Sequence, residues 1–386
     1  MPRSELLMFV EPGYGSSTWF AKSSAGLRAG VARREMTLEQ LRQLSELKQY
    51  PQAHSAVLIG ASQSWTRAMI QGLRLQGVKP VLLGCSPQDF GDDVSGPVFD
   101  RRALVERMVA YFVQAGRKRL ACVGNKWQDA NDELRKLAFL SGAQKLGLPA
   151  GEKDVFSGRG PMAAIVNRFL DHAAEYDGAL CVNDQVAVHL MAEATRRGVR
   201  VPEDLFVAGS GSCIIGSLTT PTLTTSTLDY YQMGLQAVNV CHYLERNPDI
   251  NAVCVTLPCQ LICRGSTAYV GEDGLDAGRS HPAPVALPAD SDFEHLDRIE
   301  NCLLRCDALD FGILRGMLMG HSADTIAAEL FVAHGTVSYR AKKLYQRLGV
   351  PNRQAFLQMV TPYLTNLSSL DDTAPGRDPH DLFSLS

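Results

Sequence analysis

Short apolar runs separated by longer stretches with helical spacing restrict the fold of this chain more than any other feature. Six of these runs read as buried strands: Leu6–Val10, Ala56–Gly60, Pro80–Leu83, Arg119–Val123, Gly178–Val182 and Leu205–Ala208. Parallel strands are joined by long crossovers and are buried on both faces, so this alternation predicts parallel sheets flanked by helices. Two later strands, Val253–Leu257 and Gln260–Arg264, are expected after a helix at Tyr230–Leu244. The sequence therefore predicts an α/β fold whose ligands bind at the carboxyl ends of the strands.

Composition limits the classes of protein to which the chain can belong. With 386 residues, 45% of them hydrophobic, the chain is long enough for more than one core. The net charge of −3 excludes a chain that is basic throughout, so any contact with nucleic acid must use a local patch. No apolar run reaches the ~18 residues that span a bilayer, and the first residues lack the pattern of a signal peptide. We therefore expect a cytoplasmic protein whose ten cysteines are reduced thiols.

Catalytic and cofactor motifs are not recognisable in the sequence. There is no phosphate-binding loop, no Gly-x-Ser-x-Gly elbow and no His-Glu-x-x-His pair. The spacing of Cys254, Cys259 and Cys263, and that of Cys302 and Cys306, matches no zinc pattern. We expect no catalytic residue, no metal and no cofactor, and hence a protein that is not an enzyme.

Domain boundaries follow from a change in composition near residue 270. The stretch from Val270 to Asp292 is rich in Gly, Pro, Asp and Ala and has no periodicity, which is typical of a linker. Helical spacing returns at Leu296–Cys306 and predicts three further helices up to about Leu364. We therefore predict an α/β module at 1–268, a linker at 269–293, a small all-α domain at 294–364 and a disordered tail at 365–386.

The segment Gly320–Phe356 has the pattern of two short helices joined by a tight turn. Ser322 can cap the first helix, which would bury Ile326, Ala327 and Leu330, and a turn over Phe331–Ala333 follows. The second helix would bury four apolar residues, Val337, Ala341, Leu344 and Leu348. This arrangement predicts a helix-turn-helix. From Tyr339 to Arg353 every charged side chain is basic, which makes a local cationic surface: Arg340, Lys342, Lys343, Arg347 and Arg353.

This segment resembles the DNA-binding domain of the LuxR family. The matching positions are Gly320, Ser322, Ile326, Ala327, Leu330, Thr336, Val337, Leu348, Gly349, Val350 and Arg353. The resemblance implies that the helix beginning near His334 enters the major groove of DNA. On that reading the groove-facing residues are His334, Ser338, Tyr339 and Lys342, and the phosphate-contacting residues are Thr336, Arg340, Lys343 and Arg353.

Two departures from the LuxR pattern leave a second reading open. The Leu-Thr-x-Arg-Glu entry of the family is not recognisable before Gly320, and Ala333 stands where a serine usually caps the recognition helix. A missing cap of this kind costs about 1 kcal/mol. The alternative is a helical domain with a solvated basic face that docks a protein partner.

The preceding segment, Asp177–Gly234, resembles the effector-binding domain of the LacI/GalR repressors, which have the type I periplasmic-binding-protein fold. The supporting residues are Asn183, Asp184, Gly198, Val201, Pro202, Glu203, Asp204, Gly209, Pro221, Leu223, Thr224, Thr225, Met233, Gly234 and Arg264–Thr267. Weaker likeness upstream extends the resemblance over about residues 5–268. It implies two lobes that close over a small molecule. Those repressors have a DNA-binding domain before this module, whereas here the first strand is expected at Leu6. We therefore expect the DNA-binding domain at the carboxyl end.

The resemblance carries effector-binding positions onto this chain. They are Tyr14, Trp19, Asp100, Trp127, Arg135, Asn183 and Gly211. Arg135 could pair with a carboxylate or with vicinal hydroxyls of the effector. Three positions also have a purely structural alternative: Asp100 as a helix cap, Asn183 as part of a turn, and Trp19 as a core residue.

The class of effector is left open by one substitution. Gly211 lies in VAGSGS, where the family usually has an acid that binds a sugar hydroxyl, so a sugar is less favoured here. Tyr14, Trp19 and Trp127 favour a flat or aromatic ligand if they line the cleft. We expect a sugar, a nucleoside or a small aromatic or carboxylate metabolite.

Together these predictions indicate a ligand-responsive bacterial transcription regulator that binds a small-molecule effector and double-stranded DNA. By the same resemblance it is expected to be a homodimer, since twofold symmetry lets two helix-turn-helix domains read paired half-sites. The alternative is a cytoplasmic solute-binding sensor whose C-terminal helices dock a protein. We expect no contact with a membrane.

Overall fold

The computed structural model describes residues 5–13, 18–60, 62–126, 130–268 and 293–367. These residues divide into two compact units that interleave along the chain. Unit 1 holds residues 1–107, 125–142 and 227–260, and unit 2 holds 108–124, 143–226 and 261–386. The predicted linker at 269–293 lies almost wholly outside the described residues, and so does the tail beyond residue 367.

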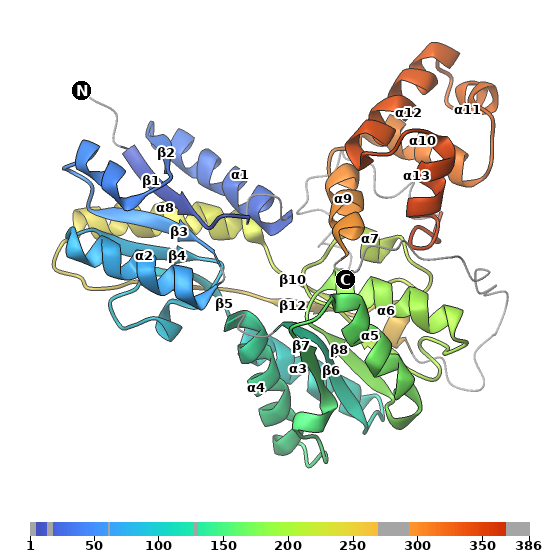
Figure 1. Ribbon diagram of the computed structural model, residues 1–386, viewed down its shortest axis with the longest axis horizontal. Coiled ribbons are helices and arrows are strands. Elements are labelled where there is room, and N and C mark those ends of the chain that lie inside the picture. The colour runs from blue at the N-terminus through green and yellow to red at the C-terminus, as the bar shows by residue number, and fades with distance from the viewer. Residues whose placement is uncertain (1–4, 14–17, 61, 127–129, 269–292, 368–386) are drawn as a thin grey trace. The chain divides into compact units, whose positions relative to one another are not determined.

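The centre of unit 1 is a parallel sheet of four strands in the order β2-β1-β3-β4 (Figure 1). The strands span Glu5–Val10 (β1), Thr37–Leu41 (β2), Ser55–Ile59 (β3) and Lys79–Leu83 (β4). In addition, β5 (Gly96–Phe99) pairs in parallel with β11 (Cys254–Leu257). The apolar runs predicted β1, β3 and β4. They did not predict β2, because this edge strand reads TLEQL and buries only Leu41 fully.

Three helices lie wholly within unit 1: α1 (Thr18–Arg33), α2 (Gln63–Leu75) and α8 (Tyr230–Arg246). Helices α3 (Arg101–Gln114) and α4 (Ala130–Lys145) are divided between the units, with residues 101–107 and 130–142 in unit 1 and the rest in unit 2. Two of them, α1 and α8, pack with their backbones in close approach. A Cβ on Gly26 would lie 2.0 Å from the carbonyl oxygen of Tyr231, and a Cβ on Gly234 would lie 2.0 Å from that of Ser23. Only glycine fits at either position.

Unit 2 contains a second sheet in the order β7-β6-β8-β9, in which β6, β8 and β9 are parallel. The strands span Leu120–Lys126 (β6), Val155–Gly158 (β7), Gly178–Cys181 (β8) and Phe206–Ala208 (β9). Helix α5 (Met162–Asp171) connects β7 to β8, α6 (Asp184–Arg196) connects β8 to β9, and α7 (Ile214–Ser217) follows β9. Two short strands, β10 (Thr225–Thr227) and β12 (Gln260–Ile262), pair with each other. Short 3-10 turns lie at Leu44–Gln49, Pro87–Asp89, Glu152–Asp154, Ala173–Glu175 and Gly265–Thr267.

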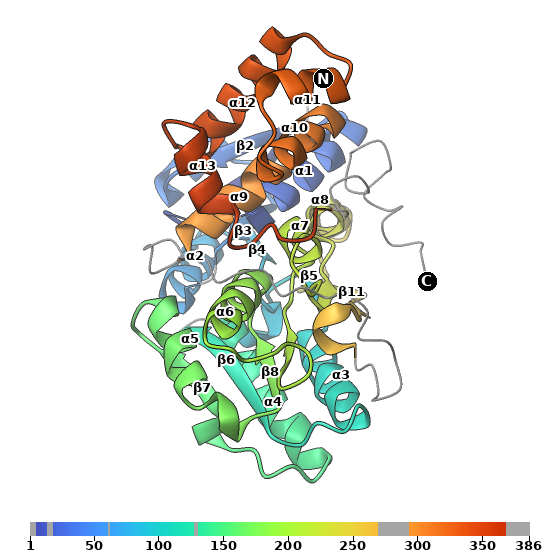
Figure 2. The same ribbon diagram turned by 90° about the vertical axis from the view of Figure 1, so that its right-hand side faces the viewer.

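Five helices form the C-terminal part of unit 2: α9 (Glu294–Leu303), α10 (Ala308–Leu318), α11 (Ala323–Glu329), α12 (His334–Leu348) and α13 (Arg353–Val360). The sequence predicted three helices after the first, and the structure has four. Gly320, whose φ is +82°, ends α10 and separates it from α11. The longest of the five, α12, packs against α9, α10, α11 and α13 (Figure 2).

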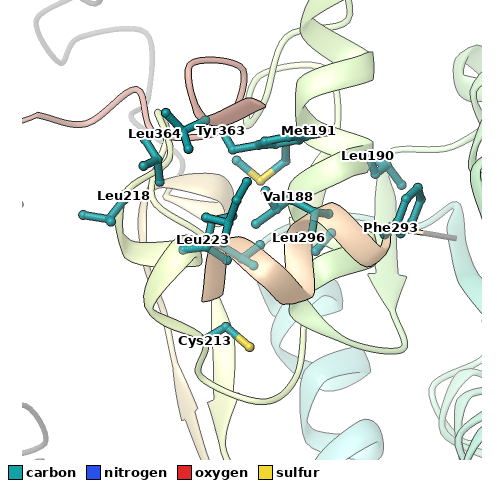
Figure 3. Close-up of a cluster of buried hydrophobic side chains, with 14 of the residues drawn as sticks. Val188, Leu190, Met191, Cys213, Leu218, Leu223, Phe293, Leu296, Tyr363 and Leu364 are labelled. Carbon is teal, nitrogen blue, oxygen red and sulfur yellow. The ribbon is translucent and has the colours of Figure 1, made fainter. Parts of the chain in front are cut away.

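A single hydrophobic core runs through unit 2 from the sheet into the C-terminal helices. Figure 3 shows where they meet: Leu296 of α9 and Phe293 lie beside residues of α6 and of the segment after α7. The Phe293 ring stacks 4.1 Å from that of His189, and the Tyr363 hydroxyl lies 2.9 Å from His295 Nε2. Ordered structure extends beyond residue 364, the predicted end of the all-α domain. The N–H groups of Thr365 and Asn366 both donate to the carbonyl of Leu218.

No helix in the described part of the chain is both long and apolar enough to cross a membrane.

We expect Gly26→Ala to lower the free energy of unfolding by about 1–3 kcal/mol, because the added methyl group meets backbone rather than a movable side chain. The matched control is Gly142→Ala in α4, where the new Cβ makes only an ordinary contact with Glu106 at 3.4 Å. Urea unfolding of both variants measures the difference. Equal midpoints would contradict the close approach of α1 and α8.

Candidate nucleic-acid interface and effector-binding residues

The helix-turn-helix predicted from the sequence is present in α11 and α12. The N–H of Thr325 donates to Ser322 Oγ at 3.1 Å, so Ser322 caps α11 as predicted. Ile326 and Ala327 are buried, and Leu330 is half-buried against the same core. The turn that follows holds Phe331 at φ +55°, with its ring 95% exposed.

The longer helix, α12, divides into a buried face and an exposed face. Its buried residues are the four that the periodicity predicted: Val337, Ala341, Leu344 and Leu348. On the other side His334, Tyr339, Lys342 and Lys343 are exposed, and Thr336 and Ser338 are half-buried. The residue at the N-cap, Ala333, has extended backbone and offers no side-chain acceptor to the first turn. The exposed face is thus polar and basic, and the opposite face anchors the helix.

Two arginines of α12 are bound by acids from the start of α10. Arg340 Nη1 donates to Asp310 at 3.0 Å and also to Asp307, and Arg347 Nη1 donates to Asp310 at 3.3 Å. Burial raises the pKa of Asp307, but hydrogen bonds from Arg340 and from the Asp310 N–H outweigh it, so the pKa lies below its usual value. These ion pairs orient α12 and reduce the free positive charge that the local sequence suggested.

A third arginine satisfies carbonyl groups at the end of α10. Arg353 Nη2 donates to the carbonyls of Met317 at 3.2 Å and His321 at 2.7 Å. The last carbonyls of a helix have no partner within the helix, so a cation there is stabilising. Arg353 therefore ties α13 to α10.

In unit 1, the predicted effector residue Trp19 belongs to an aromatic cluster. Its ring lies 6.1 Å from that of Tyr230, which in turn meets Phe99 edge-on at 5.6 Å. A Cβ on Gly84 would touch the Trp19 ring at 2.8 Å. Gly84 and Phe99 are at the carboxyl ends of β4 and β5, where ligands of parallel sheets bind. The sequence did not predict Tyr230 as a member of this cluster. Its position directly after the helix cap Asp229 gives no indication that its ring contacts Trp19.

Two more predicted effector residues of unit 1 make local bonds. Asp100 Oδ1 accepts the N–H of Ala103 at 3.0 Å, which is the helix-capping role left open above. Arg135 Nη1 pairs with Asp132 at 2.6 Å, and both side chains are largely buried. Tyr14 and Trp127 lie outside the described residues.

In unit 2, Asn183 caps α6 by accepting the N–H of Val186 at 2.9 Å. Its neighbour Asp184 is fully buried and accepts from the N–H of Cys213 at 2.7 Å and from Thr225 Oγ1 at 2.5 Å. Gly211 has φ +130°, and a Cβ there would lie no nearer than 3.9 Å to another group. Backbone conformation rather than lack of space therefore favours glycine at this position.

A separate pocket of about 300 Å³ lies in unit 1 at the amino ends of β1 and β3. Its lining includes Glu5, His54, Cys241, His242 and Glu245. None of the predicted effector residues lines it, because those follow the carboxyl ends of the strands.

Comparison with protein families identifies two parts of the chain. Residues 109–267 match the periplasmic binding protein-like domain, and residues 310–360 match the bacterial regulatory proteins of the luxR family. The chain therefore joins a periplasmic binding protein-like domain to a LuxR-family domain. Both resemblances found in the sequence are confirmed, and α10 to α13 make up the LuxR-family domain.

Similar curated proteins are transcription regulators. The NTD biosynthesis operon regulator NtdR of Bacillus subtilis is 28% identical over 196 residues, which cover 49% of this chain and 58% of NtdR. The HTH-type transcriptional repressor CytR of Escherichia coli is 24% identical over 162 residues, covering 41% of this chain and 48% of CytR. The chain thus matches only about half the length of these relatives.

Solved structures confirm the predicted α/β fold over about two thirds of the chain. A putative transcriptional regulator LacI from Bacillus cereus subsp. cytotoxis superposes with a TM-score of 0.60 at 14% identity, covering 68% of this chain and 98% of that one. The transcriptional regulator CelR in complex with cellobiose gives 0.58 at 17% identity, covering 69% and 86%. At these identities the similarity shows the fold alone.

We expect Ala333→Ser to stabilise the LuxR-family domain by about 0.5–1 kcal/mol, because a serine hydroxyl can accept an N–H of the first turn of α12. The opposite change is Asn352→Ala, which removes the cap that accepts the N–H of Ala355 at 2.9 Å. Thermal unfolding of the two variants should move in opposite directions. A destabilised Ala333→Ser protein would contradict the cap geometry.

Proposed function

We propose that this protein is a ligand-responsive transcription regulator of the bacterial cytoplasm, which binds a small-molecule effector and double-stranded DNA as a homodimer. The main support for this proposal is that one chain contains both a periplasmic binding protein-like domain and a LuxR-family domain. The relatives named as regulators of operons or of transcription support it. An enzymatic role has no such support.

DNA contact is assigned to the exposed face of α12. We propose that His334, Ser338, Tyr339 and Lys342 face the major groove and that Thr336 and Lys343 contact phosphates. Arg340 and Arg353, which the sequence also suggested as phosphate contacts, have the structural partners described above. We therefore assign them first to the positioning of α12 and α13.

Effector binding is assigned to residues that follow the carboxyl ends of strands. In unit 1 these are Trp19, Asp100 and Arg135, with Tyr230 added by its contact with the Trp19 ring, and in unit 2 they are Asn183 and Gly211. Similar structures are described with cellobiose, glucose and ribose bound. A sugar accordingly heads the classes of effector to be tested, followed by nucleosides and by aromatic and carboxylate metabolites.

A chain of buried bonds within unit 2 gives a route from the effector residues to α9, the helix that precedes the LuxR-family domain. Asp184 holds the N–H of Cys213, the residue before α7. The next two N–H groups, of Ile214 and Ile215, donate to the carboxylate of Glu300 on α9 at 2.9 and 3.0 Å. A ligand that shifts the loop before α7 thereby also shifts α9. If the ligand binds one position of α9 more tightly than another, its binding changes the affinity of the protein for DNA.

DNA binding through α12 is tested with the double variant Lys342→Ala/Lys343→Ala on a generic DNA duplex. Each phosphate contact contributes about one unit to the slope of log affinity against log salt. We expect the variant to bind more weakly and to lose one to two units of that slope, as measured by fluorescence anisotropy.

The matched control is Lys118→Ala/Lys153→Ala, which removes two exposed lysines from the sensor part and makes the same change in net charge. It should bind DNA like the parent protein. Equal affinity of the two double variants would contradict the assignment, and affinity insensitive to salt would favour the protein-docking alternative.

Effector binding is tested by thermal unfolding against a panel of sugars, nucleosides, aromatic acids and aliphatic carboxylates. A ligand at one hundred times its dissociation constant stabilises the folded protein by about 2.7 kcal/mol. We expect at least one class to raise the melting temperature, and Trp19→Ala to remove that shift while Lys153→Ala keeps it. A flat response across the panel would count against a small-molecule sensor.

A further inference from the structure

Two cysteines lie close together at the end of α9, just before the LuxR-family domain. Cys302 is on the last turn of the helix, and Cys306 is in the turn that follows it. Cys306 Sγ donates to the carbonyl oxygen of Cys302 at 3.2 Å. The N–H of Cys306 donates to the carbonyl of Leu303 at 3.0 Å, so the turn brings Cys306 back toward the end of α9.

A guanidinium group from α12 completes this cluster. Arg347 Nη1 lies 3.8 Å from Cys306 Sγ, and the same atom donates to Asp310 at 3.3 Å. The neighbouring Cys306 thiol and the charge of Arg347 lower the pKa of Cys302, although burial and Asp310 oppose them. A thiol beside a second thiol and an arginine is the setting in which cysteines become nucleophilic.

The other cysteines offer a contrast within the same chain. Burial raises the pKa of Cys181, Cys241, Cys254 and Cys259, and Cys302 together with burial raises the pKa of Cys306, whereas the pKa of Cys302 is lowered. Cys302 and Cys306 are 5% and 4% exposed, but Leu304 between them is 37% exposed. The turn that carries the pair thus borders solvent at Leu304.

We propose that Cys302 and Cys306 form a redox-modification site that hydroperoxides oxidise to a disulfide. The Cys302 sulfur attacks one peroxide oxygen; the O–O bond breaks, a sulfenic acid forms, and the leaving oxygen takes a proton to become water. The Cys306 thiol then attacks the Cys302 sulfur; the S–S bond forms, the S–O bond breaks, and a second water leaves. Two electrons pass from the thiols to one hydrogen peroxide, and a small dithiol reverses the change.

Disulfide formation alters the contacts that hold α12. It moves Cys306 Sγ toward Cys302 and away from Arg347, which shares Asp310 with Arg340. Oxidation should therefore loosen the recognition helix and weaken DNA binding. This consequence rests on the proposed function, whereas the chemistry of the two thiols does not.

The test uses the full chain, reduced, then exposed to equimolar hydrogen peroxide, with remaining thiols alkylated under denaturing conditions. Trypsin cleaves after Arg298, Arg305 and Arg315, so it separates the two cysteines into the peptides Ile299–Arg305 and Cys306–Arg315. We expect mass spectrometry to find these peptides joined by a disulfide that dithiothreitol removes. Recovery of both peptides alkylated, with oxidation at other cysteines instead, would overturn the proposal.

Single variants separate the two steps of the reaction. Cys306→Ser should stop at the sulfenic acid, which dimedone labels on Ile299–Arg305, and Cys302→Ser should give no dimedone adduct on the partner peptide. Cys241→Ser, a buried thiol on α8, is the control and should still form the disulfide. Dimedone labelling of Cys306 in the Cys302→Ser variant would contradict the assignment of Cys302 as the nucleophile.

Anisotropy with the same generic duplex then measures the regulatory consequence. The oxidised protein should bind severalfold more weakly than the reduced protein, and dithiothreitol should restore its affinity. A mapped disulfide with unchanged DNA affinity would overturn the regulatory part. If the reduced protein does not bind DNA, the proposed function is overturned. The redox site is then decided by the mass spectrometry of the two tryptic peptides alone.

Discussion

A buried carboxylate is costly to desolvate and remains in a protein interior only with its hydrogen bonds made, and this constraint organises unit 2. Asp184 is fully buried and binds the start of α7 and strand β10 at once. Glu300, also fully buried, binds the next two N–H groups of α7 from the C-terminal helices. Two acids on either side of one short helix thus attach α9, the helix that precedes the LuxR-family domain, to the α/β part of unit 2, and apolar packing around Leu296 surrounds them.

The same principle fixes the recognition helix within its own domain. Asp310 is buried and receives both Arg340 and Arg347, so α12 is held by charge on one side and by apolar residues on another. Its remaining side, with Lys342 and Lys343, is exposed. Because Arg347 also touches Cys306, the contacts that orient the helix adjoin the thiol pair. Positioning of α12 and its proposed control by oxidation therefore depend on one guanidinium group.

Local sequence predicted much of this architecture because the relevant forces act over a few residues. The central strands, the Ser322 cap and the buried face of α12 follow from apolar periodicity and capping, which neighbours in the chain determine. Strand β2 was missed because an edge strand with a polar face has little periodic signal. The charge of α12 was overestimated, since Asp307 and Asp310 lie outside the window in which the basic residues were counted.

The sequence alone determined the two domain types, their order and the residues of the helix-turn-helix, since motif spacing and helical period are properties of the chain itself. Tertiary structure decided which charges are already paired, that Tyr230 meets Trp19, that Glu300 binds α7, and that Cys302, Cys306 and Arg347 form one cluster. Partners such as Glu300 and Ile214, or Arg347 and Cys306, are 86 and 41 residues apart. Contacts across such separations depend on how elements pack, which no local pattern specifies.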